Sequence, residues 1–266
     1  MSRIDFSYEP DLHPAPRVVA VAEGPGYRIE TWRFMGEEGD DVPASVCLPE
    51  GGGPWPAVIM GHGVHSDRNA EYIAGASQAW ARLGFAVAAA DAPFHGERGG
   101  NELVPHALLA VPDFVRRAVI DGRRLLDAVD ARPDLDDRIG YVGFSMGTSL
   151  GVPLMAADSR IRAGVFCIGG STRVRWEEVR PDPSSPGDEF LEATDPVAYA
   201  PEVAPRPVLM LNADNDQIFS RRSMLALYDA FEHPKELVLF PGTHAEWKDP
   251  GRRYRTMFAF LRDSLG

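Results

Sequence analysis

Short apolar runs of strand length alternate along this chain with longer segments of helical spacing. The apolar runs at 57–60 (AVIM), 85–90 (FAVAAA) and 208–211 (VLML) are continuous. The stretch 111–135 instead places apolar residues three or four positions apart, as an amphipathic helix does. Continuous apolar strands separated by helices are typical of a mostly parallel sheet covered by helices on both faces. We therefore predict an α/β protein.

Eight strands are expected in this sheet. The stretches 27–34 and 43–50 flank a run of turn formers, which predicts an antiparallel hairpin. The other six strands begin near residues 57, 85, 138, 161, 206 and 235. We expect one domain over residues 1–266, with a short lid at about 170–200, where the connection is long and rich in proline.

Charge and cysteine content argue against several classes of protein. The net charge is −12, from 27 Lys and Arg against 39 Asp and Glu, which disfavours partners such as nucleic acid or an anionic membrane surface. We find no apolar run of membrane-spanning length and no signal-peptide-like segment near residue 1. Cys47 and Cys167 lack metal-type spacing and are expected to be reduced. These features predict a cytoplasmic protein.

The segment 143–147 (GFSMG) places Ser145 between a predicted strand and a predicted helix. Ligands of open α/β sheets bind beyond the carboxyl ends of the strands, which is where this segment lies. Glycines two residues either side of a serine fit a nucleophile elbow, a strained turn that exposes the hydroxyl at a helix N-terminus. The alternative is an ordinary glycine turn. We interpret Ser145 as a nucleophile.

A serine hydroxyl needs a base, and in this arrangement the acid and then the histidine follow the serine along the chain. His233 and His244 both lie beyond the penultimate strand, but His233 precedes the last strand and belongs to the opposite edge of the sheet. His244 follows the last strand and is the expected base. Asp214 and Asp216 both follow the penultimate strand. We favour Asp216, which sits beside an apolar pair, and keep Asp214 as the alternative.

An oxyanion hole requires two backbone N–H groups near the serine. One is expected from Met146, the residue after the nucleophile, and the other from the loop 61–66 (GHGVHS), where Val64 is the best donor. The neighbouring glycines let this loop approach a substrate closely. We expect His62 in the same loop to have a structural role.

Aromatic residues from several loops are candidates for an apolar substrate pocket. They are His65, Phe94, Trp176, Phe219 and Trp247. Each one is as well explained by core packing. Two arginines in the predicted lid, Arg173 and Arg175, are either solvated charges or contacts for a carboxylate substrate.

Together these segments resemble the α/β-hydrolase superfamily, in particular its dienelactone-hydrolase and prolyl-oligopeptidase-like serine esterases. The resemblance rests on MGHGV (60–64), DAPFHGERG (91–99), GFSMG (143–147), DQIFS (216–220) and GTHAEW (242–247), which occur in the expected order. It implies an α/β-hydrolase fold, and it implies that the nucleophile, acid and base are Ser145, Asp216 and His244. Dienelactone hydrolases use a cysteine nucleophile, whereas this chain has a serine.

We therefore predict a serine carboxylesterase that hydrolyses small or short-acyl esters through an acyl-enzyme, with no metal or organic cofactor. The expected partner is a small-molecule ester, and the chain could form a homo-oligomer. The alternatives are a thioesterase, an amidase or a carbon–carbon bond hydrolase on the same residues, or a non-catalytic binding protein on a hydrolase scaffold.

Overall fold

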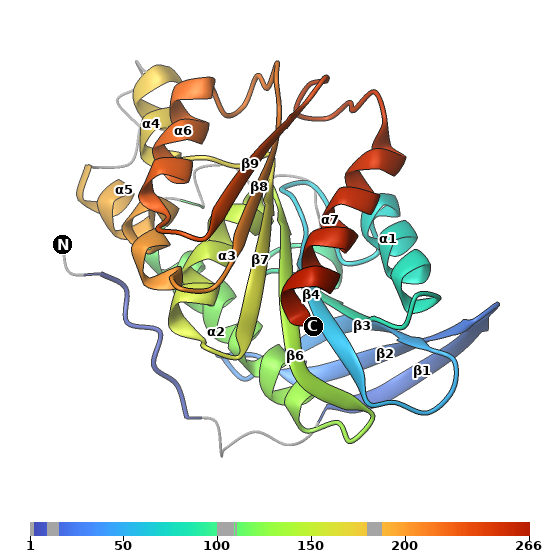
Figure 1. Cartoon of the computed structure of the whole chain (residues 1–266). Helices are drawn as coiled ribbons and strands as arrows, with labels where there is room; N and C mark the ends of the chain where they lie inside the picture. Colours follow the sequence, from blue (N-terminus) through green and yellow to red (C-terminus); the bar gives the residue numbers. More distant parts are fainter. Residues whose placement is uncertain (1–2, 10–15, 100–108, 110, 180–187) are drawn as a thin grey trace.

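A single sheet organises the molecule (Figure 1). The computed structural model describes residues 3–9, 16–99, 109, 111–179 and 188–266. Within these residues the sheet has nine strands in the order β1-β2-β3-β5-β4-β6-β7-β8-β9. They are β1 (Arg17–Gly24), β2 (Tyr27–Met35), β3 (Asp41–Pro49), β4 (Trp55–Gly61), β5 (Ala86–Ala90), β6 (Leu135–Phe144), β7 (Ile161–Cys167), β8 (Val208–Ala213) and β9 (Lys235–Phe240).

The sheet is antiparallel at one end and parallel through the rest. β1, β2, β3 and β5 pair antiparallel in that order, and β2 with β3 forms the predicted hairpin. All pairings from β5 through β4 and β6 to β9 are parallel. The predicted α/β class is thus confirmed.

The expectation of eight strands was wrong by one, because β1 was not predicted. Every residue of β1 except Gly24 is exposed, and Val18, Val19 and Val21 are each about half exposed. The strand forms by backbone pairing with β2 and has no buried face, so its side chains carry no alternation that would identify a strand.

Helices cover both faces of the sheet and bury two separate apolar clusters. The helices are α1 (Glu71–Ala81), α2 (Pro112–Asp130), α3 (Met146–Ala157), α4 (Thr172–Val179), α5 (Asp188–Thr194), α6 (Arg221–Ala230) and α7 (Pro250–Leu265). Side chains of α2, α3 and α6 share one cluster with one face of the sheet. Those of α1 and α7 share the other cluster with the opposite face (Figure 1). None of the helices in the described ranges is long and apolar enough to cross a membrane.

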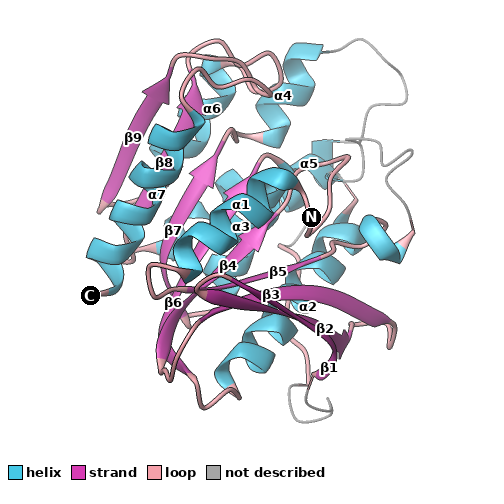
Figure 2. Ribbon diagram, turned by 90° about the vertical axis from the view of Figure 1, so that its right-hand side faces the viewer, coloured by secondary structure: helices cyan, strands magenta, loops and turns pink. Residues whose placement is uncertain are grey.

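The parallel strands direct their carboxyl ends to one edge of the sheet, as the arrows of β7, β8 and β9 show in Figure 2. The loops that follow β4, β6, β8 and β9 therefore meet at this edge. The predicted lid includes α4 and α5, and residues 180–187 between these helices lie outside the described residues.

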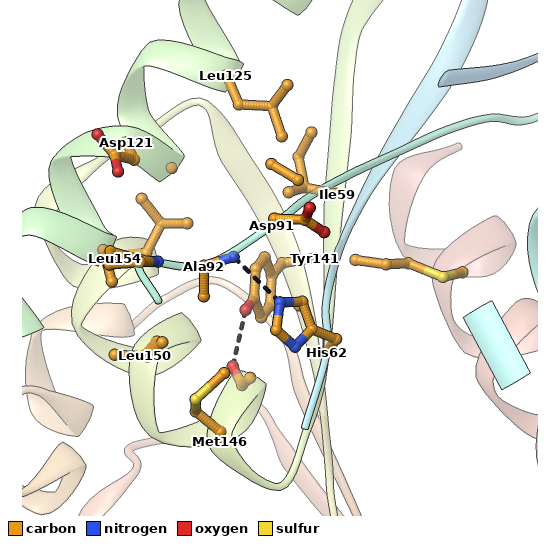
Figure 3. Close-up of a pocket in the computed structure, with 17 residues that line it drawn as sticks. Ile59, His62, Asp91, Ala92, Asp121, Leu125, Tyr141, Met146, Leu150 and Leu154 are labelled. Carbon is orange, nitrogen blue, oxygen red and sulfur yellow. Dashed lines mark hydrogen bonds between the residues drawn. The ribbon is translucent and has the colours of Figure 1, made fainter. Parts of the chain in front are cut away.

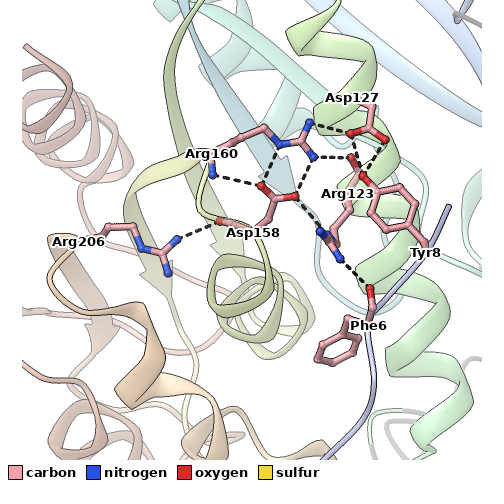
Figure 4. A network of polar contacts seen from close by, with 7 residues as sticks. All are labelled: Phe6, Tyr8, Arg123, Asp127, Asp158, Arg160 and Arg206. Atoms are coloured by element: carbon pink, nitrogen blue, oxygen red, sulfur yellow. Dashed lines mark hydrogen bonds and ion pairs between the residues drawn. The ribbon is translucent and has the colours of Figure 1, made fainter. Parts of the chain in front are cut away.

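An ionic network anchors the N-terminal segment to the helices (Figure 4). Asp158, just after α3, accepts hydrogen bonds from Arg123 at 3.2 Å and from Arg160 at 2.7 and 2.9 Å. Arg123 also donates to the carbonyl of Phe6 at 2.8 Å, and Tyr8 donates to Asp127 at 2.8 Å. The network thus joins residues 6–8 to α2 and to the start of β7.

Candidate active site

Ser145 occupies a sharp turn between β6 and α3. Its φ is 52° and its ψ is −107°, a conformation that few residues other than glycine adopt. Its N–H donates to the carbonyl of Cys167 on β7 at 3.0 Å. A side chain at Gly143 would overlap the backbone of Gly147, and one at Gly147 would overlap the backbone of Gly61. The two glycines of the motif are therefore required by the tight packing of this turn.

His244 and Asp216 meet Ser145 at the carboxyl edge of the sheet. His244 Nε2 lies 2.9 Å from Ser145 Oγ, and His244 Nδ1 lies 2.8 and 3.0 Å from the carboxylate oxygens of Asp216. A carboxylate only accepts hydrogen bonds, so Nδ1 carries the proton and Nε2 accepts from the serine hydroxyl. This is the tautomer in which an imidazole can remove the proton of a serine.

The structure brings Asp216, rather than Asp214, to the histidine. The Asp216 side chain is only 3% exposed, and its Oδ1 also accepts from the N–H groups of Ile218 and Phe219 at 2.7 and 2.9 Å. Asp214 is exposed and accepts from the N–H of Gly242 at 3.0 Å, which braces the start of the histidine loop.

Two backbone segments converge beside Ser145 at the predicted oxyanion donors. Met146 is the first residue of α3, so its N–H has no acceptor within the helix. Val64 lines the same cavity as Ser145. Gly61 and Gly147 bring the loop and the helix into backbone contact, and a side chain on either would overlap the other segment or the Tyr141 hydroxyl. Backbone packing therefore holds the loop that carries Val64 against the first turn of α3.

His62 is buried behind this loop, as expected. Its Nε2 accepts from the N–H of Ala92 at 3.0 Å, so its Nδ1 carries the proton and donates to the carbonyl of Gly63 at 2.9 Å. Burial lowers the pKa of His62 to about 4. The ring is therefore neutral near pH 7, where it can make both contacts.

A small apolar cavity of about 70 Å³ lies beneath the loop, on the side of α2 and α3 (Figure 3). Met146 and Leu150 of α3 line it together with Tyr141 of β6. The Tyr141 hydroxyl donates to the carbonyl of Gly147 at 2.7 Å, which supports the first turn of α3 from below.

The cavity that contains Ser145 and His244 is larger, about 430 Å³. Its described lining is Gly63, Val64, His65, Ser66, Tyr72, Phe144, Ser145, Ile168, Ile218, His244, Ala245, Trp247 and Arg253. His65 and Trp247, two of the five predicted pocket residues, are among these.

The other three predicted pocket residues are not in this lining, and each has a different environment. Phe94 is 46% exposed, with its ring 6.4 Å from that of Phe114. Trp176, on α4, lies under the guanidinium of Arg175 at 5.4 Å. Phe219 is buried with its ring 6.0 Å from that of His244, and it lines a separate, smaller cavity together with Asp216.

The two lid arginines have partners of their own. Arg173 pairs with Glu177 at 3.4 Å and with Glu192 at 3.2 Å, both as exposed ion pairs. The guanidinium of Arg175 lies 6.0 Å from the Phe219 ring. Neither arginine belongs to the described lining of the large cavity.

Two polar residues that line the cavity, Tyr72 and Arg253, were not predicted from the sequence. Arg253 is only 8% exposed, and its guanidinium lies 4.3 Å from the Trp247 ring and donates to the Tyr254 hydroxyl at 3.1 Å. Among the described residues no carboxylate pairs with it, and its Nε has no hydrogen-bond partner. A sequence signal existed, because Arg253 occupies the buried stripe of α7 that continues through Met257, Leu261 and Leu265.

The sheet, the elbow and the Ser–His–Asp arrangement define an α/β-hydrolase. A profile of the dienelactone hydrolase family matches residues 42–255. The chain belongs to the dienelactone hydrolase family, and it is an enzyme of the carboxylic ester hydrolase class. A comparison with curated protein sequences found no significant match.

Several solved structures share the fold. A cold-adapted esterase from an Arctic intertidal metagenomic library is 24% identical, with a TM-score of 0.75 over 93% of this chain and 98% of the other. An acetyl xylan esterase from Paenibacillus sp. R4 is 18% identical, with a TM-score of 0.79 over 96% of this chain and 90% of the other. Acetyl xylan esterase 1 from Thermoanaerobacterium sp. JW/SL YS485 is 19% identical, with a TM-score of 0.77 over 92% of this chain and 87% of the other.

Proposed function

We propose that this hydrolase is a serine carboxylesterase with Ser145 as nucleophile, His244 as general base and acid, and Asp216 as the acid that orients the histidine. The observation that carries the proposal is the continuous hydrogen-bonded line from Ser145 through His244 to Asp216. The strained elbow beneath Ser145 supports it, because such strain is concentrated at functional sites.

In the proposed reaction His244 Nε2 takes the Ser145 proton as Oγ attacks the ester carbonyl carbon. The tetrahedral oxyanion is stabilised by the N–H groups of Val64 and Met146, each contributing about 3 kcal/mol. His244 then returns the proton to the leaving alcohol, and an acyl-enzyme remains. Water, deprotonated by His244, attacks the acyl carbonyl and releases the acid, and the serine recovers its proton.

The proposed substrates are small or short-acyl esters. A cavity of about 430 Å³ is within the range of small-molecule sites and is lined largely by apolar and aromatic side chains. The names of two structural neighbours, both acetyl xylan esterases, are in line with a short acyl group.

Arg253 favours substrates that also carry a negative charge. A buried guanidinium without an acidic partner is costly, and an anionic group on a bound substrate would pair with it. We propose that the preferred esters carry such a group on the part of the molecule that lies toward Trp247 and Arg253.

We further propose a cytoplasmic location. Cys47 and Cys167 are both buried and unpaired, and burial raises the pKa of both thiols. Unoxidised thiols of this kind fit a reducing compartment.

Labelling with a fluorophosphonate, followed by peptide mass analysis, tests the proposal. We expect modification at Ser145 in the unchanged protein, none in Ser145→Ala, and loss of 4-nitrophenyl acetate hydrolysis in that variant with its melting temperature retained. Full hydrolysis by Ser145→Ala would place the nucleophile elsewhere. A series of matched esters, thioesters and anilides of increasing acyl length then separates an esterase from a thioesterase or an amidase.

A further inference from the structure

The peptide that carries the Val64 N–H has its orientation set by His62. The carbonyl of Gly63 and the N–H of Val64 belong to one trans peptide and point in opposite directions. His62 donates to that carbonyl at 2.9 Å, so the Val64 N–H points away from His62. This contact fixes one of the two peptides that flank Gly63.

The other peptide, between His62 and Gly63, is held by Tyr72. The Gly63 N–H donates to the Tyr72 hydroxyl at 2.9 Å. Gly63 lacks a side chain, and a Cβ built there would have no neighbour closer than 3.7 Å. The backbone at this glycine is thus free to rotate unless both flanking peptides are restrained.

Tyr72 is itself held in place, because its ring packs beside the residue that precedes the nucleophile. It lies in the first turn of α1, and its ring packs edge-on against Phe144, the residue before Ser145, at 4.9 Å. Its hydroxyl lies 3.0 Å from Ser66 Oγ. Burial raises the pKa of Tyr72, so the phenol keeps its proton and can accept from Gly63 and donate to Ser66 at once.

We propose that Tyr72 is a positioning residue for the oxyanion hole: its hydroxyl restrains the Gly63 peptide and thereby holds the Val64 N–H toward the oxyanion that forms on Ser145. The inference rests on the proposed serine esterase function. The hydroxyl acts on the transition state through the loop, because an oxyanion hole stabilises charge only when its donors are already in place.

The test is the Tyr72→Phe variant, which keeps the ring against Phe144 and removes only the acceptor. We expect kcat for 4-nitrophenyl acetate to fall about 10- to 100-fold and KM to change less than about threefold, as when transition-state stabilisation alone is lost. The inhibition constant of a trifluoromethyl ketone, which forms a tetrahedral adduct with an active serine, should rise by the same factor as kcat/KM falls. A loss of stability alone would not change these two quantities in proportion.

One control variant separates this role from general damage. Tyr199→Phe also removes a buried tyrosine hydroxyl, which donates to the Ala193 carbonyl at 2.7 Å, but this hydroxyl lies outside the site. The variant should lower the melting temperature and leave kcat unchanged.

Hydrogen exchange of the Gly63 amide tests the inference without any variant. In the unchanged protein its hydrogen exchange, followed by NMR, should be slower than that of exposed loop glycines such as Gly51 and Gly52. Equally fast exchange at Gly63, or a folded Tyr72→Phe enzyme with unaltered kcat and unaltered ketone affinity, would overturn the inference. If fluorophosphonate modifies Ser145 normally, such a result leaves the esterase proposal standing, whereas failure of that labelling overturns both.

Discussion

The Nε2 atom of His244 lies 2.9 Å from the hydroxyl oxygen of Ser145, although 99 positions separate the two residues in the chain. The contact exists because β6 and β9 are parallel strands of one sheet, so the loops after them open at the same edge. Asp216, at the end of β8, completes the line from behind.

Removal of the acid or the base should nearly abolish turnover. We expect His244→Ala to lower kcat/KM by about 10⁶-fold, because the serine loses its base, and Asp216→Asn to lower it by about 10⁴-fold, because the base loses its tautomer. Asp214→Asn is the matched control, since Asp214 braces Gly242 and does not contact His244. Steady-state kinetics of the three variants decide the matter, and a larger loss for Asp214→Asn than for Asp216→Asn would reverse the assignment of the acid.

The charge of Arg253 should select among substrates. We compare 4-nitrophenyl hemisuccinate, which is anionic, with neutral 4-nitrophenyl butyrate. Arg253→Gln should lower kcat/KM for the anionic ester by about tenfold or more relative to the neutral one, since a charged hydrogen bond contributes about 1.5–3 kcal/mol. Arg252→Gln is the control, because the neighbouring arginine is exposed. An equal loss for both esters would assign Arg253 a structural role only.

Substitution of a glycine packed between the loop and the elbow should harm stability and activity, whereas substitution of a glycine in open space should not. Gly147→Ala should destabilise the protein and lower kcat, because the added methyl group overlaps the backbone of Gly61. Gly75→Ala is the contrasting variant, since Gly75 is exposed in α1 with no atom within 4 Å of the added Cβ. It should stabilise the protein by up to about 1 kcal/mol. Thermal unfolding and esterase assays of the pair measure both effects, and similar melting temperatures for the two variants would contradict the overlap.

The Asp158 network should make stability depend on pH in acid. Burial alone would raise the pKa of Asp158, but the hydrogen bonds and charge of Arg160, assisted by Arg123, outweigh it and hold the pKa below its ordinary value of 3.8. A carboxyl with a lowered folded-state pKa contributes stability above its unfolded-state pKa and loses it as the pH falls through the folded-state value. Asp158→Asn should therefore lower the free energy of unfolding by about 2 kcal/mol near neutral pH, and by progressively less as the pH falls below 3.8 toward the folded-state pKa.

Urea unfolding at pH 7 and at pH 3 measures this difference. Asp263→Asn is the control, because its pair with Arg262 is exposed and should contribute almost nothing at either pH. If Asp158→Asn lowers the free energy of unfolding by the same amount at both pH values, the carboxylate charge is not what stabilises the network.

The sequence predicted the class of fold and the three residues that meet at the sheet edge, because both follow from strand order and chain order. Parallel topology alone places the ends of β6, β8 and β9 together. The choice between Asp214 and Asp216 needed the resemblance as well, since both follow the same strand.

Side-chain direction was the part that the sequence did not supply. Phe219 was expected in the substrate pocket, yet it is buried beside Asp216 in a separate, smaller cavity, and Arg253 was not expected there, yet it lines the substrate cavity. Tyr72 was overlooked for a related reason. Its role depends on which loop amide it contacts, and that contact is set by how α1 packs against β5 and β3 of the sheet rather than by spacing along the chain.

The backbone contact between Gly61 and Gly147 has a consequence for how this enzyme could change. It holds the loop that carries Val64 against the first turn of α3 with main-chain atoms, and His62 and Tyr72 orient that loop, while most of the cavity wall is made of side chains from other segments. Substitutions at Ile218 or Trp247 can thus reshape substrate choice without altering the geometry that polarises the carbonyl. Directed evolution of new ester preferences should accumulate changes at those walls and leave both glycines untouched.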